Sequence, residues 1–479
     1  MHSDSIWKDA IVRPKEHTLT GDIETEVAII GGGIAGVLTA YLLKEQGVPS
    51  IIFEADTVFS GQTGRTTAKI TSQHGLIYDK LTTRFGREGA LNYARANESA
   101  IEAYAAMIGR LGIECSFKRL PAFVYSTEEK DPLEKEATAA AELGISATYT
   151  TDTSLPFPVA GAVRFDGQAQ FHPLKFLSAL LPELTVYEHT PVMVEGNVLK
   201  AKGYSIRAKK TIFACHYPFL NAPGYYFLRM HQERSYVVAL SGAMEFDATY
   251  IGMDQNALSL RNHEGLLLLG GGGHRTGDNK GGGKYELLRR AALKYFPNSR
   301  EVAHWSAQDC MTHDGVPYIG RYSHDTPDWY IATGFQKWGM TTSMVAATLL
   351  TGAIAHEKND FGIFSPDRYV PIAAVPEFLK DGAQAAKGLL KQQFHVPEKT
   401  LNELPLTHGG VVDVEGEKLG VYKNERGECF TIHTKCPHLG CELTYNPDET
   451  SWDCPCHGSR FSYTGERLEG PAQEDATRA

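Results

Sequence analysis

Two short motifs near the C-terminal end combine side chains that bind transition metals well. Cys436 and His438 form a Cys-x-His pair, and Cys454 and His457 form a Cys-x-x-His pair. Each pair offers one thiolate and one imidazole, and five of the eight cysteines lie between positions 429 and 456. Cysteines clustered with interleaved histidines are typical of a metal site, whereas scattered cysteines are usually buried core residues.

Two kinds of metal centre fit these four side chains. In a [2Fe–2S] cluster, the two thiolates would bind one iron and the two histidines the other. A tetrahedral zinc ion would accept the same donors. Zinc fingers rarely use such a short alternation of cysteine and histidine, so the spacing favours the iron–sulfur cluster.

A glycine-rich turn near the N-terminal end indicates a dinucleotide site. Gly31, Gly33 and Gly36 lie between an apolar run and a stretch of helical composition, and Glu54 ends the next apolar run. Glycine lets the backbone approach a pyrophosphate, and the N-terminus of the helix supplies free N–H groups. The carboxylate of Glu54 can accept hydrogen bonds from ribose hydroxyls. This motif alone does not distinguish FAD from NAD.

Later segments resemble the D-amino-acid-oxidase/glycine-oxidase superfamily of FAD-dependent oxidoreductases. The run SGQTGRTTA at 60–68 is similar to the loop that wraps FAD in that family, and HDGVPYIG at 313–320 is similar to its late D-G-x-P-x-I-G element. The resemblance covers roughly residues 25 to 360 and implies FAD as cofactor. It implies FAD contacts at Gly31, Gly33, Ile34, Ala35, Gly36, Glu54, Ala55, Arg65, Thr66, Thr67, Val194, Ala214, Gly334, Gly339, Met340 and Thr341.

The residues that flank the metal ligands resemble the Rieske family. Cys441 and Cys456 stand where respiratory-chain Rieske proteins form a disulfide, so the resemblance implies that bond, with two free thiols as the alternative in a reducing compartment. Ser459 stands where that type has a hydroxyl donor to the cluster, but Phe461 replaces its tyrosine. Because hydrogen bonds raise the potential of such clusters, we expect a reduction potential below that of respiratory proteins.

One position departs from the pattern of members that oxidise amino acids. These often carry an arginine three residues before the threonine that is Thr312 here, and this chain has Asp309. A carboxylate would repel a carboxylate substrate. Another arginine such as Arg275 could take over, the substrate could be an amine without an acid group, or Asp309 could be a structural turn residue. The resemblance places five further side chains near the flavin, as catalytic residues or as core: His74, Tyr236, His274, Gln336 and Trp338.

The elements that must position these residues follow from periodicity. Helical composition at 88–111, 130–143, 340–355 and 377–393 contrasts with short β-like runs from 150 to 275. We therefore expect an α/β Rossmann-like FAD-binding domain with an antiparallel-sheet substrate domain, and a C-terminal all-β Rieske domain. The expected boundaries are 1–375 for the oxidoreductase (FAD parts about 25–90, 190–220 and 325–360; substrate parts about 90–190 and 220–325), 376–395 for a helix and linker, and 396–479 for the Rieske domain.

Composition narrows the classes of partner. The chain has 479 residues, above the ~250–300 at which one core usually divides. A net charge of −10 argues against a nucleic-acid partner. The sequence shows neither a secretory signal nor an apolar run long enough to span a bilayer, so the expected location is the cytoplasm.

The pairing of cofactors suggests a function. FAD exchanges two electrons and a Rieske cluster exchanges one, and a family of FAD-dependent oxidoreductases with a C-terminal Rieske domain carries both. We expect oxidation of an amine-type substrate, with electrons leaving through the cluster to a protein or quinone-like acceptor. One alternative is an NAD(P)H-dependent reductase, whose second nucleotide site would have to use the glycine run at 269–277. Another is an electron-transfer module without catalysis.

Overall fold

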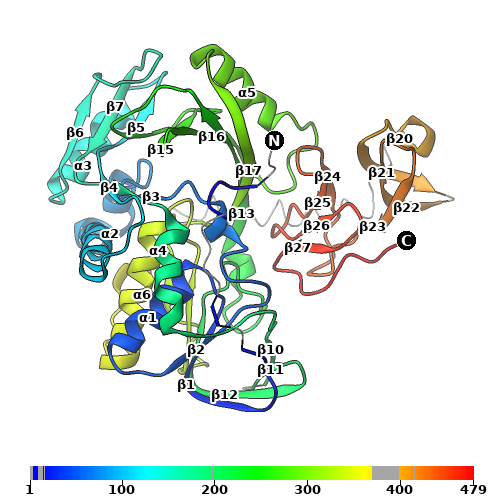
Figure 1. Ribbon diagram of the computed structural model, residues 1–479, viewed down its shortest axis with the longest axis horizontal. Helices are drawn as coiled ribbons and strands as arrows, with labels where there is room; N and C mark the ends of the chain where they lie inside the picture. Colours follow the sequence, from blue (N-terminus) through cyan, green and yellow to red (C-terminus); the bar gives the residue numbers. More distant parts are fainter. Residues whose placement is uncertain (1–3, 9–13, 16, 197, 369–398, 415) are drawn as a thin grey trace.

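The computed structural model describes residues 4–8, 14–15, 17–196, 198–368, 399–414 and 416–479. The predicted helix at 377–393 and the predicted boundary near 395 lie outside these ranges. The described residues form two eight-stranded sheets, which lie one above the other in Figure 1, and a C-terminal part with two four-stranded sheets. None of the helices in these ranges is long and apolar enough to cross a bilayer.

The first large sheet carries the glycine turn. Five of its strands are parallel in the order β9-β2-β1-β12-β19. Helices α1 and α6 pack against each other on this sheet, and α2 packs on α6. The apolar runs on either side of the glycine turn therefore form β1 and β2, the helical stretch between them forms α1, and the helical composition at 340–355 corresponds to α6. The elements are β1 (Ile23–Ile30), α1 (Ile34–Glu45), β2 (Ser50–Phe53), α2 (Tyr78–Leu111), α4 (Pro173–Leu180), β9 (Thr185–Tyr187), β10 (Met193–Glu195), β11 (Val198–Ala201), β12 (Tyr204–Phe213), β18 (Tyr318–Arg321), β19 (Trp329–Thr333) and α6 (Gly339–His356).

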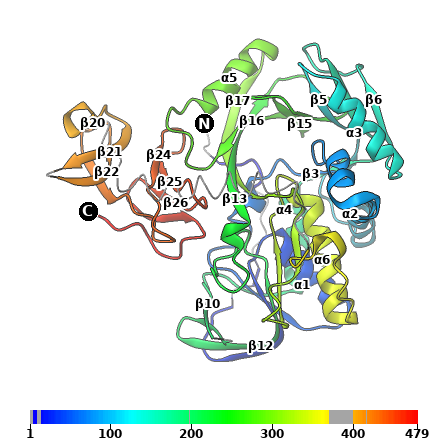
Figure 2. The same ribbon diagram turned by 180° about the vertical axis from the view of Figure 1, so that it is seen from behind.

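The second large sheet is mostly antiparallel, as the short β-like runs predict. Its order is β17-β13-β16-β15-β14-β5-β7-β6, and β14 and β5 pair in parallel. Strands β13 and β17 are long, and they run down from this sheet toward the first one in both views (Figures 1 and 2). The elements are β5 (Ala122–Ser126), α3 (Asp131–Glu142), β6 (Ala147–Thr150), β7 (Gly161–Phe165), β13 (Met230–Ser241), β14 (Thr249–Gly252), β15 (Ser259–His263), β16 (Leu266–Arg275), α5 (Lys284–Tyr295) and β17 (Arg300–Thr312).

The C-terminal part is built from β-strands, as expected. It lies beside β13 and β17 in both views (Figures 1 and 2). A small third sheet, β3-β8-β4, lies in the oxidoreductase part. The remaining elements are η2 (Gln62–Arg65), β3 (Lys69–Ile70), β4 (Lys118–Arg119), β8 (Ala169–Gln170), η3 (Leu181–Glu183), η4 (Tyr226–Leu228), η5 (Gly362–Phe364), β20 (Lys399–Thr400), η7 (Leu401–Glu403), β21 (His408–Val414), β22 (Glu417–Lys423), β23 (Cys429–His433), β24 (Thr444–Asn446), β25 (Ser451–Asp453), β26 (Arg460–Ser462) and β27 (Arg467–Glu469).

Candidate functional site

A cavity of about 1260 Å³ opens where the two large sheets meet the C-terminal part. Its wall includes the glycine turn after β1, the loop at 59–67 and the end of β12. The same wall contains 467–471 of the C-terminal part, from β27 and the turn after it. The cavity therefore touches both parts of the chain.

The glycine turn is shaped by contacts that exclude a side chain. Gly31 has a φ of +116°, and a Cβ there would lie 2.5 Å from the carbonyl oxygen of Ala214. A Cβ on Gly36 would lie 2.0 Å from the carbonyl oxygen of Gly31. The missing side chains bring α1 close to β1 and leave the backbone open to the cavity, which fits a bound pyrophosphate.

Glu54 sits at the end of β2 with its carboxylate held in place. One oxygen accepts the N–H of Gly32 at 2.7 Å, and the other accepts the N–H of Asp56 at 2.9 Å. Burial raises the pKa of Glu54, and these backbone donors oppose that effect. The side chain lines the cavity, where a second lone pair on each oxygen remains for a ribose hydroxyl.

Side-chain hydrogen bonds hold the backbone carbonyls of the loop at 65–67. The carbonyl of Arg65 accepts a hydrogen bond from the indole of Trp305 at 2.8 Å, and that of Thr66 accepts one from Trp7 at 2.7 Å. The carbonyl of Thr67 accepts one from the guanidinium of Arg261. These three residues all line the cavity, so the donors preset the wall that a dinucleotide would meet.

Most of the predicted FAD contacts share this cavity, and four lie outside its wall. Gly36 packs within the turn, and Thr341 donates to the carbonyl of Thr71. Val194 lies on the edge strand β10, and Val192 lines the cavity instead. Gly334 packs against Thr312. The contacts with FAD stay a prediction for the residues that do line it: Gly31, Gly33, Ile34, Ala35, Glu54, Ala55, Arg65, Thr66, Thr67, Ala214, Gly339 and Met340.

Four of the five predicted catalytic side chains line the cavity: Tyr236, His274, Gln336 and Trp338. His74 does not line the cavity, and its catalytic role stays a prediction. His74 is buried behind the wall, where its ring stacks on Trp338 with centroids 4.9 Å apart. Its nitrogens contact the hydroxyl of Tyr93 at 2.5 Å and the carbonyl of Thr71 at 2.8 Å. Burial lowers its pKa to about 3, so it supports Trp338 as a neutral ring.

Two residues that line the cavity were not predicted as site residues from the sequence. His216 follows β12 with a φ of +67°, and its buried Nε2 has no hydrogen-bond partner among the described residues. Lys69 is buried, and its ammonium donates to Ser259 at 2.7 Å. Burial, with Arg261 nearby, lowers the pKa of Lys69 to about 7. No local motif marks either residue, because the chain brings them into the wall only through tertiary contacts.

Asp309 lines the same cavity on β17. Burial raises its pKa to about 6, although the charge of Lys337 opposes this effect. Lys337 forms an ion pair with Glu233 at 3.1 Å. Arg275 does not join this group, because its guanidinium binds carbonyls of the C-terminal part. The suggestion that Arg275 takes the place of the missing arginine stays a prediction.

The four predicted cluster ligands come together at one end of the C-terminal part. Cys436 and Cys454 are both buried, and the interaction with the Cys454 thiol lowers the pKa of Cys436. The rings of His438 and His457 lie 4.9 Å apart, nearly perpendicular. Each ring has a buried Nδ1 without a hydrogen-bond partner in the part of the chain that the structure describes. Two thiols and two orphaned ring nitrogens are the donor set that a [2Fe–2S] cluster of the Rieske type needs.

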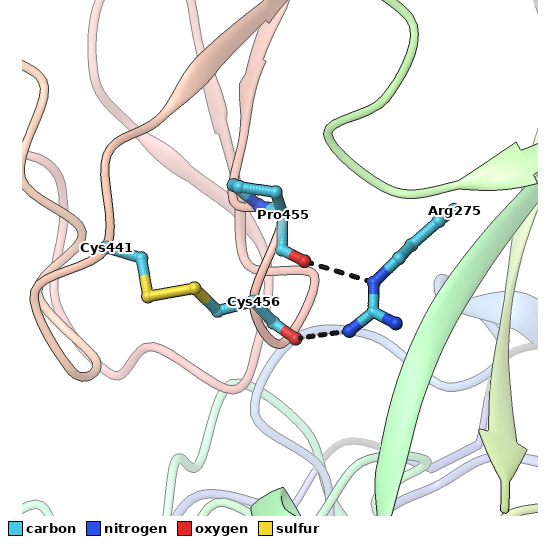
Figure 3. Close-up of a disulfide and its surroundings, with 4 residues drawn as sticks. All are labelled: Arg275, Cys441, Pro455 and Cys456. Atoms are coloured by element: carbon cyan, nitrogen blue, oxygen red, sulfur yellow. Dashed lines mark hydrogen bonds between the residues drawn. A yellow bond between two sulfur atoms is a disulfide. The ribbon is translucent and has the colours of Figure 1, made fainter. Parts of the chain in front are cut away.

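A disulfide joins Cys441 to Cys456, as the resemblance implies (Figure 3). The sulfur atoms of Cys441, Cys454 and Cys456 lie within 4.8 Å of one another. Because two of these sulfurs are spent on the disulfide, only Cys454 of the three can offer a thiolate. The bond ties the loop of Cys436 to the loop of Cys454 beside the ligand set.

The cluster end faces the oxidoreductase part. His438 Nε2 lies 2.8 Å from Oδ1 of Asn221, and the ring of Phe227 lies 5.6 Å from that of His457. The amide of Gln232, which lines the cavity, donates to the carbonyl of His457 at 2.6 Å. One side chain therefore separates the cavity from the backbone of a predicted cluster ligand.

Known proteins resemble both parts of the chain. Residues 26–353 match the family described as DAO, FAD dependent oxidoreductase, and residues 396–478 match the Rieske [2Fe-2S] domain. The Rieske 2Fe-2S iron-sulfur protein YhfW of Bacillus subtilis (strain 168) is 35% identical, over 98% of this chain and 96% of that protein.

Solved structures agree on the fold. Glycine oxidase from Geobacillus kaustophilus superposes with a TM-score of 0.61 at 20% identity, covering 73% of this chain and 100% of that one. L-Amino acid deaminase from Proteus myxofaciens superposes with a TM-score of 0.61 at 16% identity, covering 77% and 98%. At these identities, the likeness concerns the fold alone.

Proposed function

We propose a function from one premise, which is that this chain belongs to the family of FAD-dependent oxidoreductases and carries a C-terminal Rieske [2Fe–2S] domain. Its cofactors are FAD and the cluster. In our proposal it oxidises a CH–NH or CH–NH₂ group of a small amine or amino-acid-like substrate. The electrons then pass one at a time to the cluster and on to an external acceptor, either a protein or a quinone-like carrier.

The shared cavity carries this proposal. Its wall joins the dinucleotide turn to 467–471 of the Rieske domain, and Gln232 links it to the carbonyl of His457. We propose Cys436, His438, Cys454 and His457 as the cluster ligands. A cluster held by these ligands would offer the electrons of reduced FAD an exit other than oxygen.

The chain supplies binding and orientation, while FAD supplies the two-electron oxidation when bound. Glu54 and the loop at 65–67 would fix the dinucleotide end. Tyr236 and Trp338 provide aromatic walls, and the hydroxyl of Tyr236 is held by His274 Nε2 at 3.1 Å. Aromatic faces attract an organic cation such as an alkylammonium group.

Asp309 supports an amine over a simple amino acid. Its carboxylate lines the cavity, and the family resemblance implies an arginine at this position in many members that oxidise amino acids. Above its pKa of about 6, it would attract an ammonium group and repel a nearby carboxylate. The electrostatics therefore favour a cationic substrate on this side of the cavity.

The glycine run at 269–277 does not support the alternative of an NAD(P)H-dependent reductase. The glycines at 270–273 lie inside strand β16, and they line the same cavity. No helix follows them directly, since α5 begins only at Lys284. This run therefore lacks the strand–turn–helix of a second nucleotide site.

Anaerobic mixing tests the proposal. The purified holoprotein is mixed with a panel of small amines, amino acids and NAD(P)H, while the flavin absorbance and the Rieske EPR signal are recorded. Bleaching by an amine, followed by the reduced-cluster signal, is expected. Bleaching by NADH alone would overturn it. The variant Cys436→Ser should lose the EPR signal, whereas Cys429→Ser, at an exposed cysteine, should keep it.

A further inference from the structure

The cluster-binding loop presents a row of backbone carbonyls to the oxidoreductase domain. Arg275 donates from Nε to the carbonyl of Pro455 at 3.2 Å and from Nη2 to that of Cys456 at 3.3 Å (Figure 3). Gln232 donates to the carbonyl of His457 at 2.6 Å, and Gln308 donates to that of Gly458 at 2.8 Å. Side chains of the other domain thus bind four consecutive carbonyls, 455 to 458.

These donors come from three neighbouring strands. Arg275 ends β16, Gln232 lies on β13 and Gln308 lies on β17, and β13 pairs with both other strands. The two glutamines are buried, and Gln308 also donates to Oε1 of Gln232 at 2.8 Å. Its own Oε1 accepts from the hydroxyl of Thr276 at 3.0 Å. The amides are therefore oriented before they meet the loop.

Two glycines let the surfaces touch. A Cβ on Gly458 would lie 2.6 Å from Cβ of Gln232, and one on Gly277 would lie 2.6 Å from Cα of Pro455. Both glycines have positive φ, +84° and +87°. A side chain at either position would push the loop away from the donors. The cluster loop and the sheet edge are thus complementary at atomic contact.

The positive charge of Arg275 is expected to affect the reduction potential of the cluster. When the cluster takes up one electron, its net charge becomes more negative by one. A positively charged guanidinium bound to the loop that carries two of the proposed ligands would favour the reduced state, because opposite charges attract. Hydrogen bonding and charge around iron–sulfur clusters set their reduction potentials.

We propose that Arg275, Gln232 and Gln308 are positioning residues that form a carbonyl clamp, by which the oxidoreductase domain holds the cluster loop and raises the reduction potential of the cluster. The clamp does not depend on which substrate supplies the electrons. It predicts that the potential of this Rieske domain is a property of the whole chain and not of residues 396–479 alone.

The first test measures potential. Redox titration of the full-length holoprotein, followed by EPR, should give a lower midpoint for Arg275→Gln than for the unaltered chain. Arg275→Lys keeps the charge and should retain most of the midpoint. Arg164→Gln removes an arginine from an exposed ion pair and should leave it unchanged. An unaltered midpoint in Arg275→Gln, with the cluster intact, would refute the electrostatic part.

The second test measures the hold on the loop. Gln232→Met keeps the side-chain length and removes the donor. Hydrogen–deuterium exchange of the peptide covering 454–459 should become faster in this variant, and also in Arg275→Gln, with cofactor content unchanged. Exchange as slow as in the unaltered protein would refute the clamp. Because both readouts are independent of substrate, they remain decisive if the proposed amine oxidation fails.

Discussion

Arg65 and Glu469 form an ion pair of 2.7 Å that joins the loop at the FAD cavity to strand β27 of the Rieske domain. Glu469 also pairs with Arg234 at 3.0 Å and with Arg460 at 3.3 Å. Glu449 binds the same two arginines at 3.1 and 3.2 Å. Arg234 and Arg460 are almost fully buried, so each charge depends on its partners for solvation.

Replacing Glu469 by Gln should weaken the contact between the domains. Burial alone would raise the pKa of Glu469, but Arg460, Arg234 and Arg65 hold it well below its usual range. Removing one partner of a buried ion pair costs about 3–5 kcal/mol. Urea unfolding at pH 7 should show this loss in the free energy of unfolding.

The pH dependence of that loss has a defined sign. A carboxylate with a lowered pKa stabilises the fold above its unfolded pKa of about 4.3, and this stabilisation declines as the pH falls below that value. The difference in the free energy of unfolding between the unaltered protein and Glu469→Gln should therefore become smaller below about pH 4. Glu466→Gln, which breaks an exposed pair with Arg478, should cost at most about 1 kcal/mol. Equal losses in both variants would contradict the role of the network.

Substitution of Asp309 by Asn should remove a pH-dependent step in amine binding. The carboxylate ionises with a pKa of about 6, raised by burial. Affinity for a cationic amine should rise as the pH passes through 6 and should stay flat in the variant. Losing one charge-assisted hydrogen bond corresponds to about 10- to 100-fold in Kd at pH 8. Flavin difference spectra would report the binding, and a pH profile unchanged by the substitution would exclude Asp309 from the site.

Lys69 should destabilise the fold at neutral and acidic pH. Its folded pKa of about 7 lies below the unfolded value of 10.5, so the unfolded chain binds the extra proton between pH 7 and 10.5. The free energy of unfolding therefore rises as the pH increases from 7 to 10.5. Below pH 7 the buried ammonium lowers it by the full amount. Lys69→Met should therefore increase the free energy of unfolding at pH 6, by at most about 5 kcal/mol. The gain should shrink toward pH 10, and the exposed control Lys118→Met should show no such trend.

Local motifs made the two cofactor sites predictable. The glycine spacing at 31–36 and the cysteine–histidine spacing at 436–457 describe backbone turns a few residues long, which sequence alone can display. The place of His74 behind Trp338 depends on contacts with Thr341, 267 positions away. Arg275 binds Pro455 and Cys456 because β16 happens to end at the cluster loop. Such contacts follow from sheet register between distant segments, which no local pattern encodes.

Phe461 should set an upper limit on the potential of the cluster. It is fully buried on β26, in the same core cluster as Cys436 and Cys454, and Ser459 precedes it by two residues. The hydroxyl of Ser459 lowers the pKa of the Cys436 thiol, and it accepts the N–H of Ala472 at 3.0 Å. A phenyl ring offers no second donor. The native midpoint should therefore lie below the upper end of the Rieske range of about −150 to +300 mV.

Phe461→Tyr would supply the missing hydroxyl and should raise the midpoint, whereas Ser459→Ala should lower it. Redox titration followed by circular dichroism measures both. Phe430→Tyr serves as the matched control, because Phe430 lies on β23 of the other C-terminal sheet, among Tyr422 and Tyr463. A native midpoint at the upper extreme, or a midpoint that Phe461→Tyr leaves unchanged, would show that donors other than these side chains determine the potential.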